Sequence, residues 1–157
     1  EAIDLSIRIT GRLGPSEVAR KIGTIQMCVI ASPAYLAEHG TPRHPSELVH
    51  HECLSYTMIS ASQTWTFEIN GVPTTFPVRA RLNANNGEAL TQAAVQGLGI
   101  ALQPDFIAED VLASGKVVDI LKDFVSPELG IYAMLPSNRQ VPFRVRVLMD
   151  YLADHLR

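Results

Sequence analysis

The turn Asn85-Asn86-Gly87 holds the residues best suited to binding a small molecule. It follows a predicted strand and precedes a stretch with helical apolar spacing, so it should begin a helix. Its side-chain amides, together with the free N–H groups of a first helical turn, could bind an anion. Capping the helix requires only one asparagine. Capping and ligand contact are therefore two compatible interpretations of this turn.

A second polar group, Thr10, Gly11 and Arg12, comes where another predicted strand ends. The Arg12 guanidinium could hold a carboxylate through two parallel hydrogen bonds. An exposed loop cation is the alternative interpretation. Arg8 lies two residues before Thr10 and so on the same face of the strand. We therefore treat Arg8 as a weaker candidate for ligand binding.

Three other features could carry chemistry, but each has a simpler explanation. A proline-rich loop holds a possible zinc set, namely His39, His44, His50, His51 and Cys53. Its spacing fits no standard zinc pattern, which favours solvated histidines. Glu88 could be a general base, yet a helix dipole alone favours an acid in a first turn. Trp65 could stack on an aromatic ligand, but Phe67 and Ile69 share its strand face and favour a place in a hairpin core.

Composition limits the class of protein. The chain has 157 residues, of which 46% are hydrophobic and 18% charged, enough for a packed core in one domain or two small lobes. Its net charge of -3 argues against a nucleic-acid contact within this segment. Cys28 and Cys53 lack CxxC spacing, so buried thiols are favoured over a disulfide. No apolar run reaches membrane-spanning length and no standard catalytic motif is present, so we expect no signal peptide, enzyme, metal or cofactor.

Alternating apolar residues predict a strand at residues 5–10 with one covered face, then a long extended stretch at 18–31 that could cross between two lobes. Ser32-Pro33 should begin a short helix that ends at Gly40. A helical turn at 45–48 and a strand at 53–56 follow. Residues 65–82 should form an antiparallel hairpin around Asn70-Gly71.

The second half of the sequence predicts strands at 100–102, 117–121 and 131–135, and helices from about 87 to 97, 104 to 115 and 142 to 156. The inward residues that we expect for these helices are Leu90, Ala93, Ala94 and Leu98; Phe106, Ile107, Val111 and Leu112; and Leu148, Tyr151, Leu152 and His155. Arg146 and Asp150 should form an i,i+4 pair. The alternation predicts an open α/β sheet with a partly antiparallel edge, in which ligands lie at strand ends against helix N-termini.

In order and spacing, these segments resemble the effector-binding domain of LysR-type transcriptional regulators over almost the whole chain. The segments that carry the resemblance include Asp4-Leu5-Ser6-Ile7-Arg8-Ile9, Val29-Ile30-Ala31-Ser32-Pro33-Ala34-Tyr35-Leu36, Pro45-Ser46-Glu47-Leu48, Asn85-Asn86-Gly87-Glu88-Ala89-Leu90, Gly97-Leu98-Gly99-Ile100-Ala101 and Arg144-Val145-Arg146-Val147. Each segment is weakly specific alone, whereas the ordered series is specific.

The resemblance implies a two-lobed fold like that of the type 2 periplasmic binding proteins. The first lobe would comprise residues 1–31 and 135–157, and the second residues 32–134. The sequence begins at Glu1 within a strand-like segment. It lacks the family's winged helix-turn-helix, linker helix and opening strand–helix–strand of the first lobe, so we expect an N-terminally truncated domain. Thr10, Gly11 and Arg12 match the family's first-lobe loop, and Asn85 and Asn86 match its second-lobe helix start.

We therefore expect a cytoplasmic sensor that binds a small organic effector, such as a carboxylate, between its lobes. By the same resemblance, we expect a homo-oligomer, at least a dimer, that contacts DNA only through the N-terminal part and makes no membrane contact. Two alternatives stay open. One is an exported solute-binding protein of the same fold, which unpaired cysteines disfavour. The other is a lyase or dehydratase on this fold, for which no acid–base pair stands out.

Overall fold

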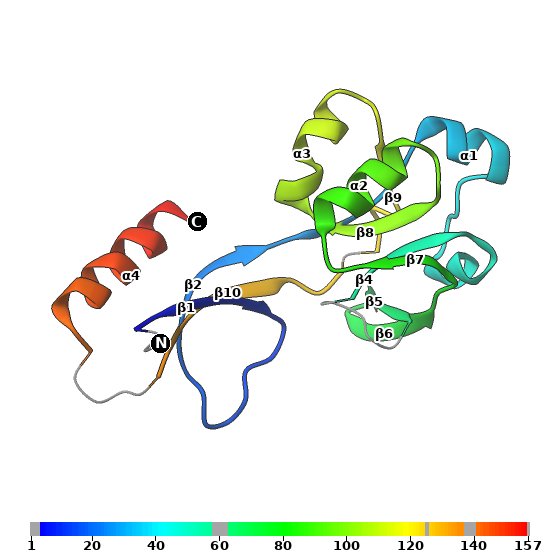
Figure 1. The fold of residues 1–157 in the computed structure, drawn as a ribbon. Coiled ribbons are helices and arrows are strands. Elements are labelled where there is room, and N and C mark those ends of the chain that lie inside the picture. The colour runs from blue at the N-terminus through cyan, green and yellow to red at the C-terminus, as the bar shows by residue number, and fades with distance from the viewer. Residues whose placement is uncertain (1–3, 58–62, 125, 137–140, 157) are drawn as a thin grey trace. The chain divides into compact units, whose positions relative to one another are not determined.

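The structure, a computed structural model, describes residues 4–57, 63–124, 126–136 and 141–156 and divides into two compact units (Figure 1). Unit 1 is Glu1–Ile25 with Glu128–Arg157, and unit 2 is Gln26–Pro127. The chain passes between them several residues earlier than the lobe boundaries that we expected at 31/32 and 134/135. The reason is strand pairing, because β3 (Met27–Ala31) pairs within unit 2 and β10 (Leu129–Leu135) pairs within unit 1.

Unit 1 is a three-stranded antiparallel sheet with one helix. Its strand order is β1 (Ser6–Thr10), β10, β2 (Val18–Ile25), and helix α4 (Phe143–His155) contacts β2. The small core joins Ile22 and Ala133 of the sheet to Val145 and Met149 of the helix. Helix α4 therefore covers the β2 side of this sheet.

Two expectations for unit 1 are wrong. The first strand has no fully covered face, since Ile7 and Ile9 are 49% and 46% exposed. Among the described residues β1 pairs with β10 alone, and α4 packs against the other edge strand. The inward face of α4 is also different: Leu148 and Tyr151 are exposed, whereas Val145 and Met149 are buried. Contact with β2, rather than the helix's own periodicity, sets that rotation.

The expected helical pair Arg146–Asp150 is replaced by a contact between distant segments. Asp150 accepts a hydrogen bond from Arg20 of β2, while Arg146 donates to the carbonyl of Val141. This ion pair is exposed on both sides, so it contributes little to stability. It does show that α4 and β2 meet through polar as well as apolar side chains.

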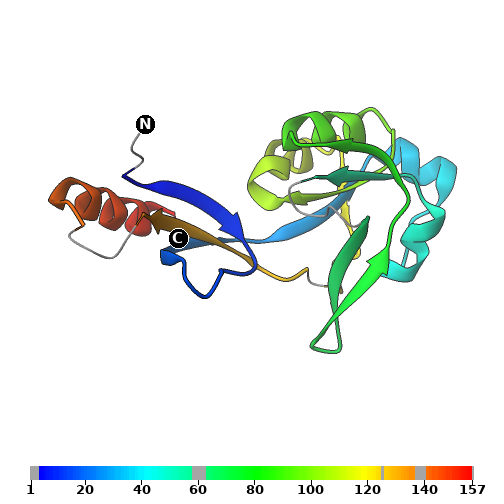
Figure 2. The same ribbon diagram turned by 60° about the horizontal axis from the view of Figure 1, so that its bottom comes forward.

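Unit 2 is built on a mixed five-stranded sheet in the order β7 (Ala80–Ala84), β4 (Cys53–Tyr56), β8 (Ile100–Pro104), β3, β9 (Val118–Ile120). Strand β4 is parallel to β7 and β8, whereas β3 is antiparallel to β8 and β9. Helices α2 (Gly87–Val95) and α3 (Asp105–Ala113) lie on one side of the sheet, and the hairpin of β5 (Thr64–Ile69) and β6 (Val72–Pro77) lies on the other (Figure 2). The α/β class expected from the sequence is confirmed.

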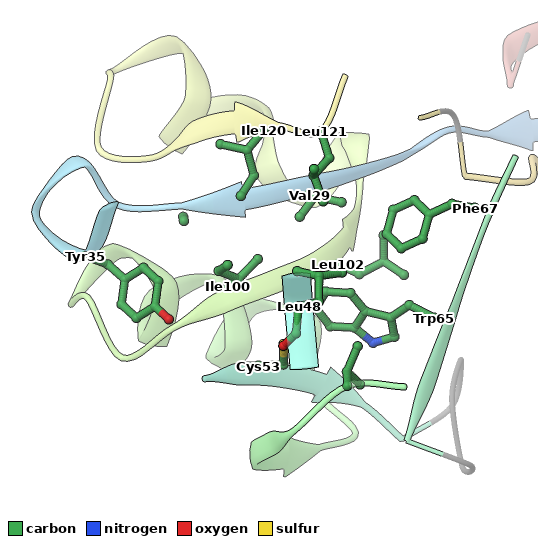
Figure 3. Close-up of a cluster of buried hydrophobic side chains, with 12 residues drawn as sticks. Val29, Tyr35, Leu48, Cys53, Trp65, Phe67, Ile100, Leu102, Ile120 and Leu121 are labelled. Atoms are coloured by element: carbon green, nitrogen blue, oxygen red, sulfur yellow. The ribbon is translucent and has the colours of Figure 1, made fainter. Parts of the chain in front are cut away.

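Each face of this sheet buries its own core. The face toward α2 and α3 buries Ile30, Leu54, Leu90 and Ala101. The opposite face meets α1 (Pro33–His39), the 3₁₀ helix η1 (Pro45–His50) and the hairpin. Figure 3 shows the aromatic and aliphatic side chains gathered there, with Trp65 only 2% exposed. The interpretation of Trp65 as a hairpin core residue is confirmed.

The residues predicted to begin and end α1 and to form the hairpin turn do so in the structure. Ser32 Oγ accepts a hydrogen bond from the Tyr35 amide at 3.1 Å, and Gly40 ends α1 with a φ of 82°. Asn70 and Gly71 both have positive φ, 52° and 78°, as a two-residue hairpin turn requires.

Three expectations for unit 2 are wrong. The return strand does not reach residue 82, because it ends at Pro77 and the chain then enters β7 beside β4. Leu98 is 37% exposed because it lies past the end of α2. Phe106 is 58% exposed, whereas Val111 is buried as expected and Ala108 is buried beside it. None of the helices among the described residues is long and apolar enough to cross a membrane.

Candidate functional site

The start of α2 places two asparagines in different roles. Asn86 has extended backbone angles, and its Oδ1 accepts a hydrogen bond from the Ala89 amide at 3.1 Å, so it caps the helix. Asn85 is exposed, and its side chain has no hydrogen-bond partner among the described residues. The capping interpretation therefore holds for Asn86, while Asn85 keeps both its donor and its acceptor available to a ligand.

The first turn of α2 also has unused backbone donors. No described residue accepts a hydrogen bond from the N–H groups of Gly87 or Glu88. The positive end of the helix dipole lies at the same place, which favours a negatively charged group. Glu88 is exposed there, in agreement with an acidic residue that simply complements the dipole. This arrangement can hold an oxyanion at the helix start.

Beneath this turn lies Gln103, a residue that sequence reasoning missed. Gln103 is 0% exposed, and among the described residues neither its Oε1 nor its Nε2 has a hydrogen-bond partner. A Cβ on Gly87 would lie 3.0 Å from Gln103 Oε1 and 2.8 Å from Ile107 Cδ1, so the glycine permits this close approach. The available signal was strand alternation, which puts Gln103 on the same buried face as Ala101.

The candidates in unit 1 follow β1, where they make local contacts. Thr10 Oγ1 donates to the Arg12 carbonyl at 2.9 Å and accepts from the Arg12 amide at 3.2 Å, which fixes the turn through Gly11. The Arg12 side chain is exposed, with no partner among the described residues. It is therefore free to hold a carboxylate.

Arg8 is already engaged within unit 1. Its guanidinium pairs with Glu17, whose carboxylate also accepts from the Gly14 amide at 2.6 Å. These two hydrogen bonds, the one from Gly14 foremost, lower the pKa of Glu17. Arg8 is thus a poorer ligand-binding candidate than Arg12. The structure groups Asn85 with Asn86 in unit 2, and Thr10 with Gly11 and Arg12 in unit 1.

The loop histidines do not gather as metal ligands. Among the described residues no three His, Cys, Asp or Glu side chains are placed to hold a metal ion. His51 is nearly buried, and its Nδ1 lies 3.0 Å from Tyr35 Oη, which also accepts from the Glu52 amide at 3.1 Å. Burial lowers the pKa of His51. His44 caps η1 by accepting from the Ser46 amide.

The two cysteines are free thiols that pack against opposite faces of the unit 2 sheet. Desolvation raises the pKa of both Cys28 and Cys53 to about 12. Both therefore stay protonated at neutral pH and are poor nucleophiles. The expectation of two thiols rather than a disulfide is confirmed.

Comparisons with known proteins match the whole chain. The family model described as the LysR substrate binding domain covers residues 1–157. The HTH-type transcriptional regulator PtxR of Pseudomonas aeruginosa is 35% identical, over 99% of this chain and 50% of its own length. The structure is similar to the CrgA regulatory domain of Neisseria meningitidis, with a TM-score of 0.80, 33% identity, and coverage of 99% of this chain and 76% of that one.

Full-length AphB of Vibrio cholerae is also similar, with a TM-score of 0.80, 29% identity, and coverage of 98% of this chain and 52% of that one. The chain spans about half the length of the curated relatives it matches. These likenesses confirm the fold class expected from the sequence, that of the LysR-type regulatory domains.

Proposed function

This chain belongs to the LysR substrate-binding domain family, and we propose that it senses a small organic effector for a DNA-binding transcriptional regulator. DNA contact would come from a part of the regulator outside this chain. The effector would act by binding one conformation of the regulator more tightly than another, which shifts the population toward that conformation.

The observation that carries this proposal is the free polar surface at the start of α2. Asn85 has unused side-chain groups, and the Gly87 and Glu88 amides have no acceptor. A carboxylate suits this set, because every available backbone group there is a donor and the helix dipole favours a negative charge.

Within unit 1, we propose that Arg12 is a second group able to bind a carboxylate. Its guanidinium is exposed and makes no ion pair with any residue that the structure describes, whereas Arg8 is held by Glu17. Thr10 and Gly11 would contribute by fixing the backbone that carries Arg12.

The test is calorimetric titration of the full-length regulator with lactate, propionate, tartrate and succinate. Asn86→Asp keeps a capping oxygen but adds a negative charge, so we expect it to lose carboxylate binding while the protein stays folded. Asn70→Asp makes the same change at the exposed hairpin turn and is the matched control. The double variant Arg12→Ala, Asn86→Ala should also lose binding. A regulator that binds no carboxylate, or variants that bind as the natural protein does, would contradict the site.

We further propose that the regulator is a cytoplasmic homo-oligomer and that the domain releases its effector unchanged. Sedimentation of the full-length protein with and without effector would measure its oligomeric state. Recovery of the ligand after prolonged incubation would show whether any turnover occurs. A chemically altered ligand would favour the enzyme alternative.

A further inference from the structure

The carboxamide of Gln103 is buried beside a largely aliphatic core. That core consists of aliphatic side chains such as Leu90, Ala94 and Ala108. Gln103 lies at the end of β8 and is 0% exposed, and in the part of the chain that the structure describes its acceptor and its donor are both unpaired. Because a buried unpaired amide is costly, a side chain of this kind indicates a polar partner that the protein meets in another state.

The carboxamide faces the start of α2. Residue 87 has no side chain to separate the two, since a Cβ there would lie 3.0 Å from Gln103 Oε1. The Thr91 hydroxyl, one helical turn further along the same face, is also buried and has no partner in residues 4–57, 63–124, 126–136 and 141–156. Polar groups with unmet hydrogen bonds therefore lie both outside and beneath the first turn of α2.

We propose that Gln103 determines the specificity of the effector site by binding a hydroxyl group next to the effector's carboxylate. A hydroxyl donates one hydrogen bond and accepts another, which matches the free Oε1 and the free Nε2 of Gln103. The carboxylate would meet the Gly87 and Glu88 amides, so the effector is a hydroxycarboxylate. This inference rests on the proposed function and names its ligand class.

Binding of the effector's hydroxyl and carboxylate groups requires one side chain to move. The half-buried side chain of Ile107 lies against Gly87, with Cδ1 2.8 Å from where a Cβ would be. On this proposal, the Ile107 side chain would rotate away from Gly87 to admit the hydroxyl group to the carboxamide. The hydroxyl then replaces the apolar contact with two hydrogen bonds.

The experiment compares acids that differ by hydroxyl groups alone. Calorimetric titration of the full-length regulator with lactate against propionate, and tartrate against succinate, should show about tenfold tighter binding of the hydroxylated acid in each pair. Gln103→Met should abolish that preference and leave the affinity for propionate and succinate unchanged. Gln92→Met is the control, because it makes the same change at an exposed position of α2.

Stability separates this role from a structural one. Since Gln103→Met removes an unpaired buried amide, its melting temperature should equal or exceed that of the natural protein. If Gln103 served only to stabilise the fold, Gln103→Met would instead lower the melting temperature. Equal affinities for the paired acids in the natural protein, or an intact preference in Gln103→Met, would overturn the inference but leave the proposed function standing. Absence of binding by all four acids would remove both.

Discussion

Removing the cap of α2 should destabilise unit 2 by a modest and measurable amount. In Asn86→Ala the Ala89 amide loses its only side-chain acceptor, which lies 3.1 Å away in the folded chain. The lost side chain is exposed, so no cavity forms and the cost is that of the cap alone, about 1 kcal/mol. Asn86→Gly should cost only a few tenths of a kcal/mol, and Asn86→Asp should be close to neutral, because its carboxylate can accept the same hydrogen bond.

The single tryptophan provides the assay. Trp65 is 2% exposed in the core of unit 2, so its fluorescence follows unfolding of the unit that carries α2. For a chain of this length, a loss of 1 kcal/mol lowers the melting temperature by roughly 2–4 °C. Urea titrations should give the same order of stability, with Asn86→Asp above Asn86→Gly and Asn86→Ala lowest.

An Asn86→Ala variant that unfolds at the same midpoint as the natural chain would refute this reasoning. It would mean that the Oδ1 contact does not stabilise the helix start, and that the only role left for Asn86 is in the proposed binding of the effector. A loss well above 2 kcal/mol would also count against it, because capping does not supply that much.

Three further predictions concern the same unit. Gly87→Ala should cost about 1–3 kcal/mol in urea unfolding, since its Cβ would lie 2.8 Å from Ile107 Cδ1; a neutral result would contradict the close packing. The lowered pKa of His51 means that the unfolded chain binds a proton more readily, so the free energy of unfolding should fall as the pH drops below 6.5. In His51→Gln the free energy of unfolding should depend less on pH in this range. An unchanged dependence would mean that other groups cause it. Cys53, fully buried with a pKa of about 12, should react with iodoacetamide only after denaturation, so labelling of the folded chain would disprove its burial.

The sequence predicted the elements of this fold well wherever a local signal decided them. Ser32, Asn86 and the Asn70-Gly71 turn act through hydrogen bonds and backbone angles of their immediate neighbours. The residues that follow strands were likewise recognisable as ligand-binding candidates. Their chemical type and position in the chain sufficed.

Errors arose where a choice between distant partners decided the outcome. Residues 80–84 continue the alternation of the hairpin, yet they form β7 because their backbone pairs with β4. Tyr151 fits a helical stripe, but β2 selects the neighbouring stripe that contains Met149. The spacing of apolar residues shows which face of a helix or strand is most apolar. It does not show which element packs against that face.

The turn at Asn85 and Asn86 could be identified from the sequence alone as a helix start able to bind an anion, because capping and free amides are properties of a few adjacent residues. Only the tertiary structure placed Gln103 beneath Gly87 and left its carboxamide without a partner. That contact joins residues 16 positions apart, through the packing of α2 and α3 on β8. Local chemistry marked the helix start that we propose as the effector site, and long-range packing placed the buried Gln103 next to it.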